Sequence, residues 1–252
     1  MSKRRGFTLL ETIVALAVTS ILLAGLVPLL GRTSNRAREQ ESIAGMLALK
    51  ESIAGTPDSA GFIASMGRLP RSLDELLASP QQGRAGLGGL PVGWVGPYLS
   101  SGSPDPLRDG WGRSYLLDPC SAPGSWRLRS LGPDGSKSTD DDLVVPPQGC
   151  FPSTGTLRLE ILRDAGGALA APGGNLAVTL YSALDGEELS FAGTAAGNFV
   201  SFLCSGADCQ IPLGTHAVSV QLDGGSLFWR NVAVTRAVNS ASLAFPFPPR
   251  VN

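Results

Sequence analysis

Four aspartates lie within nine residues near the middle of the chain and could bind a cation. They are Asp134, Asp140, Asp141 and Asp142. Their negative charges repel one another unless a cation or water neutralises them. Hard oxygen donors suit calcium, which accepts about six to eight oxygen ligands in an irregular cage. A calcium loop and a solvated acidic turn both remain open, because aspartate and glycine also dominate ordinary turns.

A second group of chemically important residues lies at the N-terminus. Three cations, Lys3, Arg4 and Arg5, precede an almost wholly apolar stretch over residues 7–30. As a helix, at about 1.5 Å per residue, this stretch is roughly 36 Å long, enough to cross a hydrocarbon core of about 30 Å. The cations would keep the leading segment on the cytoplasmic side. Glu11 lies near the start of the apolar stretch, where an unpaired charge costs on the order of a few kcal/mol, so it needs a partner.

The residue inventory argues against the common enzyme classes. His216 is the only histidine, which excludes an HExxH zinc site, and no G-x-S-x-G, C-x-x-C or P-loop pattern occurs. We expect His216 to be a packed or surface side chain rather than a catalytic base. The formal net charge is −1, and removing the three N-terminal cations leaves −4, which argues against nucleic-acid binding. We therefore expect no enzyme and no nucleic-acid partner.

The four cysteines are few but even in number. Outside the cytoplasm they can pair as Cys120 with Cys150 and Cys204 with Cys209. Spacing alone does not fix connectivity, so four free thiols remain an alternative.

The sequence predicts one long helix at the N-terminal end, which would carry Glu11. Beyond the apolar stretch, hydrophobic residues recur at three- and four-residue steps to about residue 50, with charged residues between them. Gly55, Pro57 and Gly61 indicate that the helix ends by about Gly55.

Short elements are expected after the helix. Ser72 and Glu75 form an S-x-x-E capping box, which predicts a short helix over residues 72–78. The glycine-rich residues 83–96 predict a loop, and residues 126–131 alternate as a strand does.

The last hundred or so residues predict a separate all-β unit. Five alternating runs are separated by glycine and asparagine turns, over residues 156–163, 175–181, 198–203, 216–222 and 226–235. This pattern is typical of an antiparallel sandwich of about seven strands.

The N-terminal sequence GFTLLE, residues 6–11, resembles the signal of type IV pilins and type II secretion pseudopilins. The resemblance implies that a prepilin peptidase cuts after Gly6 and methylates the new amino terminus of Phe7. It also makes Glu11 the assembly glutamate, whose carboxylate neutralises the Phe7 ammonium of an adjacent subunit in a shared helical core. The alternative is a plain membrane anchor in which Glu11 pairs with its own Phe7 amine, four residues upstream.

The central region carries a second resemblance. The sequences GRLP at 67–70, WVGPYL at 94–99 and DGWGRSY at 109–115 resemble the head of the major pseudopilin of type II secretion. Leu69 and Gly110 depart from the family pattern, which has tyrosine and proline there. Apart from the family, the aromatic residues in these motifs are expected to build a small core.

The acidic loop resembles the calcium loop of major pseudopilins. The match implies side-chain ligands at Asp134, Asp141 and Asp142, with backbone carbonyls near Leu131 and Thr139; Asp140 could substitute for a neighbouring aspartate, because the spacing is not identical to the family's. Near the C-terminus, IPLGTHAVSV at 211–220 resembles a strand of transthyretin-like and carboxypeptidase-regulatory modules, which are usually scaffolds or ligand-binding units.

We therefore predict an α+β chain with four parts: a leader over 1–6, a transmembrane and stalk helix over 7–55, a pseudopilin head over 56–149, and a β-sandwich over 150–252. Its expected function is a structural subunit of a type II secretion pseudopilus, with the sandwich projecting outward from the fibre. The precursor would cross the inner membrane once, and its globular part would be periplasmic or extracellular. The implied partners are membrane lipid, identical or homologous pilin subunits, the prepilin peptidase and the inner-membrane assembly platform.

Two other functions stay open. The chain could be a minor pilin of a type IV pilus whose sandwich binds a surface or ligand, which the added domain favours. It could also be a membrane-anchored binding protein that never polymerises.

Overall fold

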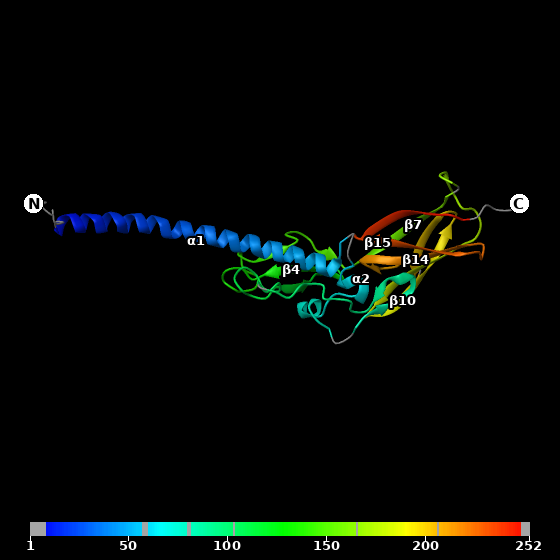
Figure 1. Ribbon diagram of the computed structural model, residues 1–252, viewed down its shortest axis with the longest axis horizontal. Coiled ribbons are helices and arrows are strands. Elements are labelled where there is room, and N and C mark those ends of the chain that lie inside the picture. The colour runs from blue at the N-terminus through cyan, green and yellow to red at the C-terminus, as the bar shows by residue number, and fades with distance from the viewer. Residues whose placement is uncertain are drawn as a thin grey trace, which may run out of the picture.

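The computed structural model describes residues 9–56, 60–79, 82–102, 104–164, 166–205 and 207–247, and for residues 21–32 it describes the backbone alone. It contains mostly strands with a few helices, as predicted. A long helix, a small head and a β-sandwich follow one another along the longest axis of the molecule (Figure 1). The predicted processing residues Gly6 and Phe7 lie outside the described residues.

Helix α1 spans Leu9–Ala54 and is 46 residues long. At about 1.5 Å per residue, its length is roughly 69 Å. It ends where the sequence predicts, at Gly55, which adopts a φ of 82° that suits glycine. In the described part of the chain, no helix combines the length and the apolar character needed to cross a membrane.

The head packs against the last third of α1. Its elements are α2 (Phe62–Met66), η1 (Leu73–Leu76), β1 (Arg84–Ala85), η2 (Leu87–Gly89), β2 (Pro91–Val92), β3 (Leu116–Pro119), β4 (Ser125–Ser130), β5 (Leu143–Val145) and β6 (Phe151–Pro152). An antiparallel sheet has the order β3-β4-β5, with β6 also pairing with β4. Strand β4 matches the predicted strand, and its Trp126 and Leu128 are fully buried. They meet Met46, Leu49 and Ile53 of α1 in the core.

The capping box predicted before η1 does not form. Ser72 precedes the helix but makes no side-chain capping hydrogen bond. Glu75 instead pairs with Arg68 at 2.8 Å, and a charge-assisted hydrogen bond of this kind is stronger than a neutral one. The short helix exists, but as a 3₁₀ turn of four residues.

The sandwich contains ten strands connected as one sheet. They are β7 (Thr154–Asp164), β8 (Leu169–Ala170), β9 (Leu176–Leu184), β10 (Glu187–Ala196), β11 (Phe199–Cys204), β12 (Ala207–Asp208), β13 (Ile211–Pro212), β14 (Gly214–Leu222), β15 (Leu227–Val234) and β16 (Val238–Phe245). The main order is β13-β7-β11-β10-β9-β14-β15, and β16 pairs with β7.

The expectation of a purely antiparallel sandwich is wrong for one pair, because β16 runs parallel to β7 over eight residues, from Val238 opposite Thr156 to Phe245 opposite Arg163. Alternation in a sequence reveals which residues form a strand but not the direction of the strand's neighbour. One hydrophobic core joins the two units, since buried residues of the head and the sandwich form a single cluster.

Candidate functional site

The first candidate site is the apolar surface of α1. Among the side chains of α1 that the structure describes, eight large apolar ones are exposed, namely Leu9, Leu10, Ile13, Val14, Leu16, Val18, Ile43 and Leu47. The head covers only the last third of the helix, so Leu9 and Leu10 are 81% and 73% exposed. Six of these side chains lie close together in sequence between Leu9 and Val18, and an exposed apolar surface of this kind marks a site for a membrane or a protein partner.

Glu11 lies within this surface, two residues after Leu9 and two before Ile13, and its side chain is exposed. A carboxylate in the middle of an apolar contact surface is costly unless the contact supplies an opposite charge. The structure thus places Glu11 on the exposed surface of α1, beside these apolar side chains.

The acidic loop connects β4 to β5, and the three predicted side-chain calcium ligands each take part in hydrogen bonds in or next to it. Asp142 Oδ2 accepts hydrogen bonds from the Arg129 guanidinium and, at 2.7 Å, from the backbone N–H of Ser138. Asp134 Oδ1 accepts the N–H of Ser136 at 2.7 Å. The N–H of Asp134 donates to Asp141 Oδ2 at 3.0 Å, and this bond lowers the pKa of Asp141.

The two carbonyls predicted as ligands also have partners within the loop. The carbonyl of Leu131 accepts the N–H of Gly135 at 3.1 Å, and that of Thr139 accepts the N–H of Asp142 at 3.3 Å. No group of three or more metal-binding side chains gathers within the described ranges. One oxygen is nevertheless unsatisfied, since Asp142 Oδ1 is buried without a hydrogen-bond partner.

Two arginines that the sequence analysis did not single out hold this loop. Arg113 donates to the carbonyls of Gly132 and, at 2.9 Å, Pro133. Arg129 bridges Asp142 and Asp118, and its bond to Asp118 Oδ2 is 2.7 Å long.

Asp118 lies at the centre of the same charge network. Lys137 donates to its Oδ1 at 2.8 Å. Burial alone would raise the pKa of Asp118, but the hydrogen bonds from Lys137 and Arg129 outweigh it and lower that pKa. The buried acid is therefore ionised and anchors the base of the acidic loop.

Two disulfides are present, and both have the pairing proposed from the sequence. Cys120 pairs with Cys150, which ties the end of β3 to the start of β6. Cys204 pairs with Cys209 across a sequence separation of five residues at one end of the sandwich.

The junction between head and sandwich is the third candidate site. Helix α2 and the loop after it pack against β9 and β14. The backbone N–H of Gly186 donates to the carbonyl of Met66 at 2.9 Å. Among the described residues, three ion pairs cross the junction: Arg68 with Asp185 at 3.1 Å, Arg71 with Asp185 at 3.7 Å and Arg84 with Glu187 at 2.6 Å.

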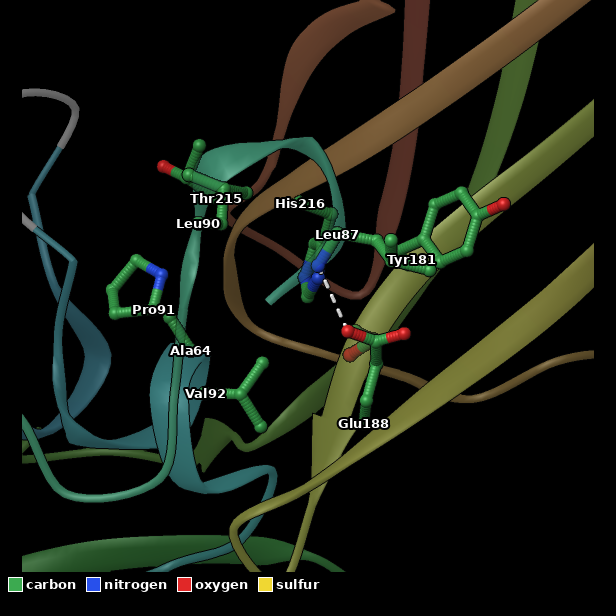
Figure 2. A pocket seen from close by; sticks show the side chains of 10 residues that line it. Ala64, Leu87, Leu90, Pro91, Val92, Tyr181, Glu188, Thr215 and His216 are labelled. Carbon is green, nitrogen blue, oxygen red and sulfur yellow. Dashed lines mark hydrogen bonds between the residues drawn. The ribbon is translucent and has the colours of Figure 1, made fainter. Parts of the chain in front are cut away.

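A small cavity of about 10 Å³ lies at this junction, and the imidazole of His216 forms part of its wall (Figure 2). The N–H of Leu87 donates to Glu188 Oε2 at 2.8 Å, which holds the head's β1–β2 loop to the sandwich. His216 is buried, and its Nε2 lies 2.7 Å from the carbonyl of Pro212. Burial lowers the pKa of His216 to about 4, so the ring is neutral at physiological pH. The neutral ring thus packs at the junction between head and sandwich.

Two family descriptions match parts of this chain. Residues 1–27 match the prokaryotic N-terminal methylation motif, and residues 60–145 match the type II secretion system protein G. The remainder, including the whole sandwich, lies outside both ranges.

Curated relatives agree with the second match. The chain is 28% identical over 143 residues to the type II secretion system core protein G of Escherichia coli (strain K12), covering 56% of this chain and 90% of that protein. The proteins of the same name from Dickeya chrysanthemi and Klebsiella pneumoniae are 26% and 27% identical over 148 and 144 residues, with 85% and 94% of their lengths covered. No solved structure matches the chain.

Together, the motif and the head define a prokaryotic protein that carries an N-terminal methylation signal ahead of one long helix. Within that class, the comparisons support the pseudopilin family, and the head is similar to the type II secretion system protein G.

Proposed function

We propose that this chain is a structural subunit of a type II secretion pseudopilus, inserted by residues 7–30, cleaved after Gly6, methylated at Phe7 and assembled through α1. The observation that carries the proposal is the exposed apolar surface of α1 together with a head similar to the type II secretion system protein G. The exposed apolar side chains of α1 gain stability only by burial in lipid or against other helices.

The mechanism of assembly follows from the position of Glu11. In a bundle of parallel α1 helices, the carboxylate of Glu11 meets the terminal ammonium of Phe7 on an adjacent subunit. The two groups are four residues apart in sequence, so their pairing sets an axial offset of about 6 Å between neighbours. In a core free of water the pair is strongly coupled, and either charge left alone would be costly. The pairing therefore selects one register among the many that apolar contacts alone would allow.

The cellular setting follows from the same elements. The precursor lies in the inner membrane with its head on the periplasmic side, where the prepilin peptidase and the assembly platform would act on it. Both disulfides suit an oxidising compartment.

Replacing Glu11 with alanine tests assembly. We expect the Glu11→Ala chain to insert in the membrane normally but to be absent from sedimented filaments, because the Phe7 ammonium of the adjacent subunit then has no carboxylate to pair with. Glu51→Ala is the matched control, since Glu51 is an exposed acid near the other end of α1 and should leave assembly unchanged. Normal filaments from Glu11→Ala would refute the pairing mechanism.

Processing has a separate test. Mass spectrometry of the membrane-extracted protein should find a chain that begins with N-methylated Phe7. An intact Met1 would contradict the proposed cleavage.

We further propose that the acidic loop takes up calcium through Asp134, Asp141 and Asp142, with the carbonyls of Leu131 and Thr139. The buried, unsatisfied Oδ1 of Asp142 supports this, because a cation would satisfy it. Bound calcium would neutralise the carboxylates and fix the loop. Arg129 already compensates part of the charge of Asp142, so we expect a modest affinity.

Calcium should raise the melting temperature of the detergent-solubilised full chain, because a ligand bound only to the folded state stabilises it. Asp142→Asn should abolish the rise and Asp140→Asn, at a position not assigned as a ligand, should largely keep it. An identical melt of the unmodified chain with calcium and with chelator would exclude the site.

A further inference from the structure

A cavity of about 270 Å³ lies where α1, the head and the sandwich meet. Its walls come from the C-terminal end of α1, from β6 of the head, and from β14 and β15 of the sandwich. Ala233 and Thr235 are exposed, so the cavity opens to solvent beside them. Small-molecule sites often lie between domains and measure about 300–1,000 Å³, so this cavity has the place and nearly the size of such a site.

Hydrogen bonds and ring contacts fix the walls of the cavity. The carbonyl of Pro152 accepts the indole N–H of Trp126 at 3.3 Å, and the ring of Phe151 packs on that of Trp126 with centroids 5.1 Å apart. On the sandwich side, Leu213 is buried, and its N–H donates to the carbonyl of Ser153 at 2.9 Å. A preformed cavity orders few side chains on binding, which favours affinity for a ligand.

Much of the lining of the cavity is apolar. Ala54, Phe151, Leu213 and Ala233 contribute side chains that carry no polar atom. Placing an apolar ligand surface against them is favourable, because it removes that surface from water. The lining therefore suits a ligand with an apolar body.

One cation and three hydroxyl groups also line the cavity. They belong to Lys50, Thr56, Thr215 and Thr235. Within the part of the chain that the structure describes, none of these four side chains makes a hydrogen bond or an ion pair. The fold leaves their polar atoms available, so a ligand can bind to them.

The charge of the lining favours an anion. Lys50 is the only charged residue among the described residues that line the cavity. The C-terminal end of α1, at Ala54, carries a partial negative charge of roughly half a unit, which is smaller than the full charge of the ammonium. A carboxylate on the ligand would pair with this ammonium and accept hydrogen bonds from the threonine hydroxyls. Hydrogen bonds between ionised groups are stronger than those between neutral groups.

We propose that this cavity binds a small hydrophobic carboxylate, with its carboxylate at Lys50 and its apolar body against Phe151 and Leu213. The bound molecule would contact α1, the head and the sandwich together, so it would stabilise their joint arrangement. The inference goes beyond the proposed function and does not depend on assembly through α1.

Fluorine NMR with para-(trifluoromethyl)phenylacetate tests the site on the full chain in a non-ionic detergent. We expect saturable broadening of the probe signal beyond that caused by empty micelles. Lys50→Met keeps an unbranched apolar side chain and should weaken binding by about tenfold or more, because the charged partner is lost, whereas Lys50→Arg should largely keep it. Arg36→Met is the matched control, since Arg36 is an exposed cation of α1 outside the cavity, and it should leave binding unchanged.

A second comparison uses the unmodified chain alone, so it holds even where Lys50→Met does not fold. The neutral analogue para-(trifluoromethyl)phenylethanol should bind about tenfold more weakly than the carboxylate. Equal binding of the two probes, equal binding by Lys50→Met and the unmodified chain, or no binding beyond that of empty micelles would overturn the proposal. None of these outcomes bears on filament assembly, which Glu11→Ala tests separately.

Discussion

Acid should destabilise this protein through a single buried histidine. The pKa of His216 is lowered by burial from about 6.5 to about 4 in the folded protein, whereas the unfolded chain keeps the ordinary value. The stabilising effect of the neutral ring is fully present above about pH 6.5. This stabilisation is lost as the pH falls toward 4, because His216 then binds a proton in the unfolded state but not in the folded state. Each pKa unit corresponds to about 1.4 kcal/mol, so the loss totals on the order of 3 kcal/mol.

The assay compares urea unfolding of the detergent-solubilised full chain with that of a His216→Gln variant at pH 7 and pH 4.5. Glutamine keeps a donor for the Pro212 carbonyl but does not titrate in this range. We expect the variant to lose clearly less stability than the unmodified chain, with the other titrating groups common to both. Because His216 is the only histidine, its imidazole NMR signal can be followed directly. Equal losses in the two chains, or an imidazole that titrates near 6.5, would refute the reasoning.

Three further predictions concern stability, each measured by urea unfolding of the full chain. Gly67→Ala should lower the free energy of unfolding by several kcal/mol, because Gly67 has a φ of 72° and Ala183 occupies the place of the new Cβ. The control Gly166→Ala should lower it by only about 1 kcal/mol, since Gly166 has a similar φ of 76° but open space around it. Arg129→Met should lower the free energy of unfolding by about 3 kcal/mol, because it removes the cation that Asp118 and Asp142 share and leaves Asp118 with Lys137; equal stability would contradict the charge network. Opening the Cys120–Cys150 disulfide should lower the free energy of unfolding by about 4 kcal/mol, and opening Cys204–Cys209 should lower it by about 2 kcal/mol, because the first disulfide closes the longer loop. A larger loss from Cys204–Cys209 would contradict this entropic reasoning.

Local sequence patterns predicted much of the fold. The glycine at position 55 ends α1 as expected. All five alternating runs of the C-terminal region are strands, because hydrophobic alternation directly reflects one buried and one exposed face. Strands β10 and β16 were missed, since alanine, serine and glycine blur their alternation.

Contacts between distant residues could not be predicted in this way. Arg113 and Arg129 lie well before the aspartates of the acidic loop, and no spacing rule links them to it. The capping box predicted at Ser72 does not form for the same reason, because Glu75 makes an ion pair with Arg68 instead. The close contact of Gly67 with Ala183 could not be predicted from the sequence, because a glycine at a tight contact and a glycine in an ordinary turn look the same there.

Photo-crosslinking within native filaments tests the assembly mechanism most directly. A photoreactive phenylalanine analogue at Leu10, one residue before Glu11 on the exposed surface of α1, should form adducts with α1 of a neighbouring subunit, about one turn away in register. Adducts with lipid alone, in a preparation that contains filaments, would contradict assembly through this helix.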